Sequence, residues 1–356
     1  MLRRRLGVAA LVLTPLILPT ALATAANVAS PAVNPAARVA ATTVTGTVAA
    51  TDRLNDGSTA GSNSAAVFVV PTQIQGAQTR PGSRGFGYDL GGVATVESLD
   101  LFQYVGGSSR GARARLADVV VHTAAGDFAA TLPDQDAVTI TLPTPVATSW
   151  VTLETNTQHD GADPAIGIAE LGVNASKGIS PRRANVALGR PVTLLGTGWS
   201  GTGDLTDNVL AGATSDLSTS RVNAAGGATS LGLDIDLGAS ATVNGLGLAE
   251  NDYGASGGRR LAQGVRLLFS DDATFATVNG TRDLTLANIP YQQVDFDPAA
   301  GRYVRLTLLS RYTNRDESFG VTEVQLFAVP EPTAVALVLP ALMLLRRTPR
   351  ERTRVH

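Results

Sequence analysis

The feature that most constrains this chain is an internal repeat. The stretch Gly87–Gly91 (GYDLG) returns as Leu233–Gly238 (LDIDLG), and the offset from Asp89 to Asp236 is 147 residues. Later segments keep the same order and spacing: 150–154 parallels 303–307, and 168–171 parallels 321–324. A duplication of this length predicts two copies of one folded unit.

The local pattern predicts β-structure throughout both copies. Short alternating runs rich in Val, Thr, Leu and Ile are separated by clusters of Gly, Asp, Asn and Ser, and no helical period is sustained. We predict strands at Ala65–Val70, Thr95–Gln103, Ala117–Thr123, Ala137–Leu142, Trp150–Glu154, Ile168–Val173, Leu231–Leu237, Val243–Ala249, Gly264–Ser270, Tyr291–Phe296, Tyr303–Leu309 and Val321–Phe327.

Composition shifts divide the chain into six segments. The predicted organisation is a signal peptide at 1–25, a disordered Ala- and Pro-rich segment at 26–37, a β-sandwich at 38–175, a linker at 176–184, a second β-sandwich at 185–328 and a sorting signal at 329–356.

The first 25 residues have the three parts of a secretory signal peptide. Three arginines at 3–5 precede an apolar run, residues 6–18, and the small residues 20–26 follow it. The run is shorter than the about 20 apolar residues that a transmembrane helix needs. We therefore predict export, with cleavage near Ala25 or Ala26.

The C-terminal segment combines a short motif, an apolar run and a basic tail. The motif Val329-Pro330-Glu331-Pro332 precedes the apolar run 333–345, and arginines follow that run. This order resembles the PEP-CTERM sorting signal of Gram-negative bacteria. The resemblance implies a short hydrophobic helix that anchors the chain transiently in the inner membrane. It also implies cleavage by an exosortase-type enzyme and delivery to the outer surface or extracellular matrix.

Four motifs in the second copy carry a further resemblance: DIDLG at 234–238, SDD at 270–272, GRYVRL at 301–306 and FGVTEV at 319–324. With these motifs the second copy resembles the discoidin, or coagulation factor C-type, family, which includes the family 32 carbohydrate-binding modules. In the first copy the resemblance rests on 89–91, 150–153 and Glu170. It implies two tandem jelly-roll β-sandwiches of the galactose-binding-like type, and we predict an all-β chain of this kind.

Enzymatic chemistry finds little support. The chain has no cysteine, which excludes disulfides and thiol nucleophiles, and its three histidines include His356 in the tail predicted to be removed. Asp204, Asp207, Asp216, Asp252, Asp271 and Asp272 could in principle pair as glycosidase carboxylates, but such acids are common in β-turns. A net charge of −2 with a single lysine offers no basic field for nucleic acid. We predict no catalytic residue and no nucleic-acid partner.

The discoidin resemblance implies a structural Ca²⁺ between an early acidic loop and a glutamate of the last strand. Carboxylate and carbonyl oxygens are the ligands that Ca²⁺ prefers. The alternative is that these acids only cap turns and that the last-strand glutamate binds backbone amides. The candidate ligands are Asp204, Asp207, Thr214 and Glu323 in the second copy, and Asn55, Asp56 and Glu170 in the first.

Sugar recognition needs aromatic faces for apolar C–H groups and planar polar side chains for hydroxyls. Aromatic residues make up only 5% of the chain, so those in predicted loops are informative. The candidate ligand-binding residues are Trp199, Asn251, Tyr253, Arg311, Tyr312, Asn314 and Arg315.

These features predict an exported, non-catalytic surface or matrix protein that binds extracellular polysaccharide or another glycan through its discoidin-like domains. A second possibility is a structural or adhesion protein of the matrix that binds other proteins without a sugar pocket. A glycan-processing enzyme is the third, and it is disfavoured because no catalytic domain remains beside the two modules.

Overall fold

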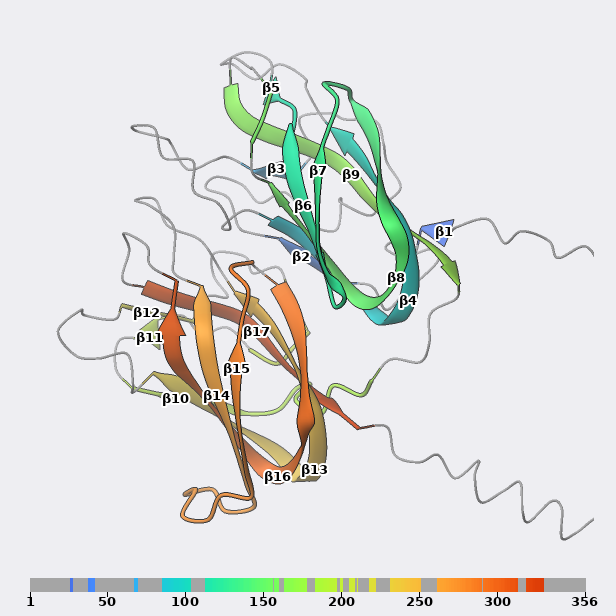
Figure 1. Ribbon diagram of the computed structural model, residues 1–356. Helices are drawn as coiled ribbons and strands as arrows, with labels where there is room; N and C mark the ends of the chain where they lie inside the picture. Colours follow the sequence, from blue (N-terminus) through green and yellow to red (C-terminus); the bar gives the residue numbers. More distant parts are fainter. Residues whose placement is uncertain are drawn as a thin grey trace, which may run out of the picture.

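The structure is a computed structural model, and all of its described secondary structure is β-strand (Figure 1). Among the described residues no helix is long and apolar enough to cross a membrane. The predicted signal peptide and residues 330–356 lie outside the described residues, which are 26–27, 38–41, 67–69, 85–103, 113–155, 157–159, 163–177, 183–196, 199–200, 205–208, 210, 218–221, 231–250, 261–289, 291–312 and 318–329.

The first half of the chain forms one nine-stranded sheet. Its main path runs β1-β9-β4-β8-β6-β7, with β2 beside β4 and with β3 and β5 beside β9. Two residues of the segment predicted to be disordered, Ala26 and Asn27, form β1 and pair with β9. The strands are β1 (Ala26–Asn27), β2 (Arg38–Ala41), β3 (Val67–Val69), β4 (Gly85–Gln103), β5 (Arg113–Ala114), β6 (Asp118–Thr123), β7 (Gly126–Thr131), β8 (Ala137–Thr155) and β9 (Asp163–Lys177).

The second half repeats this topology in an eight-stranded sheet. The path β9-β4-β8-β6-β7 of the first sheet corresponds to β17-β13-β16-β14-β15 of the second, and both β4 and β13 span 19 residues. The strands are β10 (Val192–Leu195), β11 (Trp199–Ser200), β12 (Ser218–Arg221), β13 (Gly232–Glu250), β14 (Ala262–Ser270), β15 (Gly280–Thr285), β16 (Tyr291–Arg311) and β17 (Ser318–Ala328). The all-β prediction and the duplication are confirmed in the described residues.

A bend in one long strand lets each sheet fold into a sandwich. The pairing of β4 shifts register after Asp89, and that of β13 shifts after Asp236. Gly91 and Gly238 follow these aspartates with φ of 72° and 79°, a left-handed conformation that glycine adopts without strain. On one side of the bend β4 pairs with β2, and on the other with β9, so one strand serves both layers. We call the two units the first and second sandwich.

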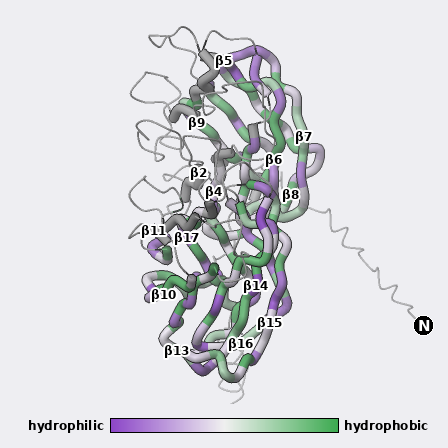
Figure 2. The backbone as a smooth tube through the Cα atoms, turned by 90° about the vertical axis from the view of Figure 1, so that its left-hand side faces the viewer, coloured by the Kyte–Doolittle hydropathy of each residue, from purple (hydrophilic) through white to green (hydrophobic). Residues whose placement is uncertain are grey.

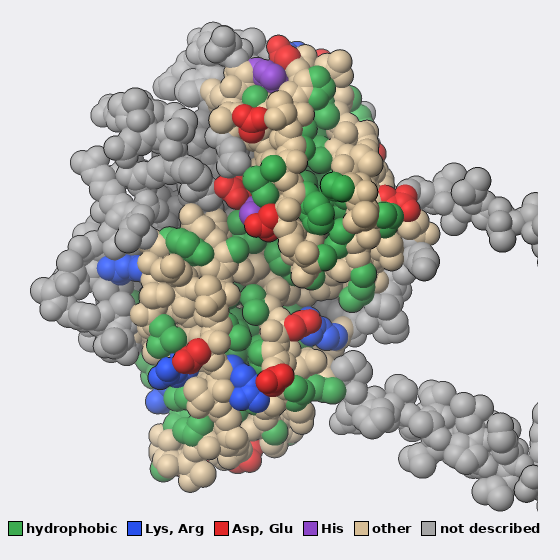
Figure 3. Space-filling model, in the orientation of Figure 1, with side chains coloured by type: hydrophobic (Ala, Val, Ile, Leu, Met, Phe, Trp, Pro, Cys, Tyr) green, Lys and Arg blue, Asp and Glu red, His purple; other side chains and the backbone are tan. Residues whose placement is uncertain are grey.

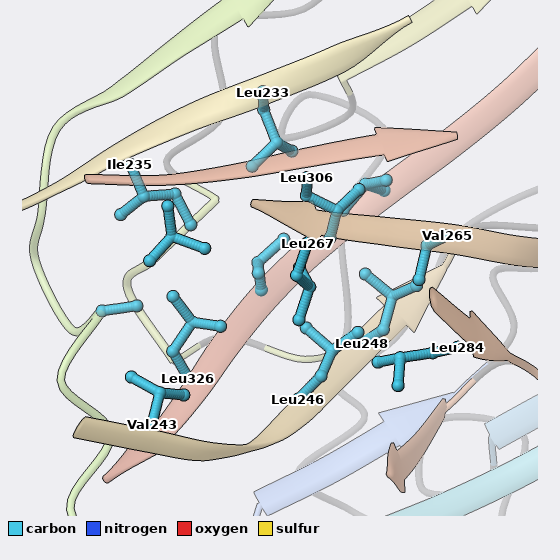
Figure 4. Close-up of a cluster of buried hydrophobic side chains, with 14 of the residues drawn as sticks. Leu233, Ile235, Val243, Leu246, Leu248, Val265, Leu267, Leu284, Leu306 and Leu326 are labelled. Carbon is cyan, nitrogen blue, oxygen red and sulfur yellow. The ribbon is translucent and has the colours of Figure 1, made fainter. Parts of the chain in front are cut away.

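Alternating side chains from both layers fill the core of each sandwich. In β13, Leu233, Ile235, Leu246 and Leu248 are at most 1% exposed, and Figure 4 shows them converging with leucines and valines of β14 and β16. Hydrophobic and hydrophilic residues alternate along such strands in Figure 2, as expected when one face of a sheet is buried.

Each of the twelve strands predicted from the sequence overlaps a strand of the structure, and nine of them lie wholly inside one. The predicted breaks between strands were partly wrong. Residues 137–142 and 150–154 belong to the single strand β8, and 232–237 and 243–249 both belong to β13. The Pro-Thr-Pro run at 143–145 falls where the β4–β8 register shifts. A proline is tolerated at such an irregularity because the ladder needs no N–H donor there.

The two sandwiches contact each other directly. Strands β8 and β16 approach one another, and a buried apolar cluster contains Trp150 from the first sandwich with Leu210, Ala249, Ile289 and Tyr291 from the second. Figures 1 and 2 show the two units one above the other. We call the contact that β8, β16 and this cluster make between them the junction.

Candidate ligand-binding site

One end of the second sandwich gathers the ends of four long strands. Glu250, at the end of β13, lies opposite Val321 near the start of β17, and Ala262, at the start of β14, lies opposite Arg311 at the end of β16. Residues 251–260 and 313–317 connect these strands at this end. We call the region formed by Glu250, Leu261, Tyr312 and Ser318 the loop end.

A buried carboxylate holds two strands together at the loop end. Glu250 is 3% exposed, and its Oε1 accepts the backbone N–H of Ala262 at 2.7 Å. This bond spans the connection 251–260 at its base. A carboxylate that accepts a backbone N–H makes a stronger bond than a neutral acceptor would.

Tyr312 closes the other side of the loop end. Its hydroxyl donates to the carbonyl of Leu286 at 2.6 Å, and its N–H donates to the carbonyl of Leu261 at 3.1 Å. Burial of the ring, together with the negative charge of Glu250, raises the pKa of Tyr312 above its usual value. The hydroxyl therefore stays protonated and serves as an internal donor.

The same bonds recur in the first sandwich with different side chains. Gln103 Oε1 accepts the N–H of Leu116 at 2.7 Å, as Glu250 does for Ala262. His159 Nε2 lies 3.0 Å from the carbonyl oxygen of Leu132, and the backbone N–H of His159 donates to the carbonyl of Arg115. The hydroxyl and the backbone N–H of Tyr312 bind Leu286 and Leu261 in the same way. The repeat therefore extends to the bonds that close this end of each sandwich.

The structure describes three of the seven predicted ligand-binding residues, and these lie at or near the loop end. Arg311 and Tyr312 are described there, both half-buried at the end of β16. The backbone of Trp199 pairs with Ser220 of β12, which itself pairs with β17 beside the loop end. Asn251, Tyr253, Asn314 and Arg315 lie outside the described residues, in the connections that leave the loop end.

The predicted calcium ligands are described only in part. Glu323 is fully buried, and its Oε1 accepts the N–H of Asn208 at 3.0 Å. Asn208 has a φ of 68°, and Asp207 beside it is exposed. Glu170 occupies the same position of β9 and is 3% exposed. Among the described residues no three His, Asp or Glu side chains gather as a metal site; Asn55, Asp56, Asp204 and Thr214 lie outside them.

A buried histidine and two carboxylates form a cluster on the outer face of the first sandwich. His122 Nδ1 lies 2.8 Å from Asp127, and Nε2 lies 2.8 Å from Glu154. Burial lowers the pKa of His122, but the bonds to Glu154 and Asp127 outweigh it, so the net shift is upward. His122 thus links β6 to β7 and β8, and His159 links the chain after β8 to Leu132, so both histidines tie segments of the fold together.

Sequence reasoning missed Glu250, although a signal for it existed. Gln103 and Glu250 stand at the same offset of 147 residues as Asp89 and Asp236. Both are polar residues at the end of an otherwise apolar strand. A hydrogen-bond acceptor at the end of this strand in both copies predicts a bond to a backbone N–H of the segment that follows the next loop.

No protein-family model matches the sequence, and no curated protein matches it. Among solved structures, a fucolectin from striped bass serum is 14% identical, with 85% of this chain and 98% of that chain covered and a TM-score of 0.31. A fucose-binding module of Streptococcus pneumoniae is 16% identical, covering 43% and 100%, with a TM-score of 0.33. A chitosan-binding module from a Paenibacillus chitosanase/glucanase, in complex with chitotriose, is 16% identical, covering 40% and 100%, with a TM-score of 0.31. At identities and TM-scores this low, the matches assign no function to this chain.

Proposed function

We propose that this protein is an exported, non-catalytic surface or matrix protein that binds extracellular polysaccharide at the loop end of the second sandwich. The observation that carries the proposal is the strand register. It brings Glu250 and Val321 together beside Ala262 and Arg311, so that the connections bearing the candidate aromatic and planar polar residues leave the sandwich at one end.

The chemistry of those residues suits a sugar. Trp199, Tyr253 and Tyr312 offer aromatic faces for the apolar side of a pyranose ring. Asn251, Arg311, Asn314 and Arg315 offer amide and guanidinium groups for its hydroxyls. Few polar groups placed against an aromatic surface are the usual composition of a small-ligand site.

The described part of the loop end is held by internal bonds. Glu250 binds Ala262, and Tyr312 binds Leu286 and Leu261. Such bonds fix the points from which the connections depart. A site built on fixed points loses less conformational entropy when a ligand binds.

We also propose that Ca²⁺ has a structural role in this sandwich. Glu323 is a buried carboxylate next to the turn at Asp207 and Asn208, and oxygen donors of this kind suit the ion. With Asp204 and Thr214, Glu323 and Asp207 would hold it, and Asn55, Asp56 and Glu170 would be the counterpart in the first sandwich. The ion would tie the early loop to the last strand.

Export and surface delivery complete the proposal. The signal-like residues 1–25 and the motif Val329–Pro332 with its apolar and basic tail support transit through the inner membrane. An exosortase-type enzyme is the proposed processing partner. Its cleavage would release the two sandwiches to the outer surface or matrix.

The experiment is a glycan-array and matrix-polysaccharide pull-down with residues 26–329, run with calcium and with a chelator. We expect retention on a defined set of glycans. Trp199→Ala and Arg315→Ala should each reduce it by about tenfold or more, because each removes a principal contact. Arg113→Ala, in the first sandwich, is the matched control and should leave retention unchanged.

Tyr312→Phe separates a positioning role from a contact role. It keeps the ring and removes only the bond to Leu286, which should lower stability by about 0.5–1.5 kcal/mol. Glycan retention by Tyr312→Phe should stay close to that of the unaltered chain.

If the unaltered chain binds no glycan and its Tm still rises in calcium, the result would favour the structural matrix role instead.

A further inference from the structure

The two copies of the bend aspartate have different surroundings. Each accepts the N–H of a glycine two residues later, Gly91 at 2.9 Å and Gly238 at 2.8 Å. Asp236 then pairs with Arg302 at the surface of its own sandwich. Asp89 is only 1% exposed, and it reaches the other sandwich.

Two glutamines of the second sandwich bind the Asp89 carboxylate. Gln293 Nε2 donates to Oδ1 and Gln325 Nε2 donates to Oδ2, each at 3.2 Å. These glutamines lie on β16 and β17, and both are at most 8% exposed. A buried carboxylate is stable only when such donors replace the water it has lost.

The donors of this network are fully matched to acceptors. The second N–H of Gln293 donates to the hydroxyl oxygen of Tyr291 at 2.7 Å, and that of Gln325 donates to Asn208 Oδ1 at 2.7 Å. The hydroxyl of Tyr291 donates to Gln325 Oε1 at 2.9 Å, and that of Ser149 donates to Gln293 Oε1 at 2.7 Å. A buried network with every partner present rigidifies the structure around it.

The strand beneath the network carries small residues where the first copy has large ones. At the offset of 147, Gly247 and Ala249 replace Asp100 and Phe102. A Cβ at Gly247 would lie 3.1 Å from Cβ of Gln325 and 3.2 Å from the ring of Phe327. The absence of a side chain at Gly247 therefore leaves room for Gln325, whose amide points at Asp89.

Apolar burial adds to the network. Trp150 is 6% exposed and packs with Leu210, Ala249, Ile289 and Tyr291 of the other sandwich. Next to it, the hydroxyl of Thr152 donates to the carbonyl of Tyr291 at 2.9 Å. Separating the sandwiches would expose this cluster and leave the amides and the carboxylate to find new partners.

We propose that the two sandwiches fold and unfold as one cooperative unit held in a single orientation, with Asp89 as the residue that positions them. The inference goes beyond the proposed sugar binding and does not depend on it. Tandem modules joined only by a linker would instead unfold independently and sample many orientations.

The first test is calorimetric unfolding of the full chain and of the matched variants Asp89→Asn and Asp236→Asn. The unaltered chain should show one transition. Asp89→Asn removes the negative charge and places an NH₂ group against one of the two glutamine amide donors, so we expect the transition to split or its Tm to fall by about 5 °C or more. Asp236→Asn loses only a partly exposed ion pair and should keep one transition with a smaller shift.

The second test does not depend on a junction variant that folds. The chain has no cysteine, so Ala125→Cys and Val278→Cys, both at exposed positions, can be spin-labelled specifically. A narrow distance distribution between the labels is expected. A broad distribution, two independent transitions in the unaltered chain, or equal effects of Asp89→Asn and Asp236→Asn would each overturn the proposal.

Discussion

Equivalent outer faces of the two sandwiches meet different surroundings. Beside the bend of the first sandwich stand Asp89, Trp150 and Thr152, all buried at the junction. Tyr303 and Arg305 hold the positions of Trp150 and Thr152 in the second. The backbone is the same, so the outward side chains alone decide whether a face meets protein or water.

The outer face of the second sandwich is a ladder of ion pairs. Arg305 pairs with Asp234 at 2.7 Å, Arg302 with Asp236 at 2.9 Å and Arg266 with Asp283 at 2.7 Å. Figure 3 shows acidic and basic side chains side by side on this sandwich. Charged side chains of this kind suit a face that meets water.

The largest effect should come from equivalent core positions. Leu99 and Leu246 are both 0% exposed and 147 residues apart. Each leucine to alanine change should cost about 2–5 kcal/mol, because a buried side chain is replaced by a cavity. If the sandwiches are coupled, both variants lower the Tm of the same single transition. If a variant lowers the Tm of one of two transitions and leaves the other unchanged, the two sandwiches are not coupled.

A smaller loss of stability should distinguish equivalent positions of the long strands β13 and β4. Gly247→Ala places a Cβ against Gln325 and Phe327 and should cost about 1–3 kcal/mol through overpacking. Asp100→Ala, at the equivalent position, loses bonds to Thr139 and Asn174 near the surface. Chemical denaturation should show the smaller loss for Asp100→Ala. The reverse order would mean that Gly247 is not part of a tight contact.

The smallest effects should be on how the stability of each sandwich depends on pH. His122 has a raised pKa, so its contribution is complete below its ordinary pKa of 6.5 and is lost as pH rises through the folded value. Hydrogen bonds from Arg302 and from the N–H of Gly238 lower the pKa of Asp236 from 3.8 to about 2. Its contribution is present above pH 3.8 and is lost as pH falls toward 2.

Thermal unfolding between about pH 2 and about pH 9 measures both contributions. His122→Gln should flatten the alkaline side of the Tm profile, and Asp236→Asn should flatten the acid side. Because the sandwiches are proposed to unfold together, both changes should act on one Tm. If the Tm of His122→Gln still falls at alkaline pH, a group other than His122 causes that fall.

Much of the fold followed from local patterns. Alternation located the strands, and the offset of 147 residues identified the duplication that the two sheets share. The sequence predicted the loop end only in part. Its pattern selected Arg311 and Tyr312 but did not predict the bond from Tyr312 to Leu286. That partner is a backbone carbonyl, which carries no residue-type signal.

The sequence by itself determined the all-β class, the duplication and the candidate loops, because these depend on local periodicity and on spacing along the chain. Only the tertiary structure decided that Asp89 is buried and Asp236 is not. Both occur in nearly the same local sequence, and their difference comes from Gln293 and Gln325, which are 204 and 236 residues away from Asp89. Contacts over such separations depend on how two surfaces meet, and local pattern does not encode that.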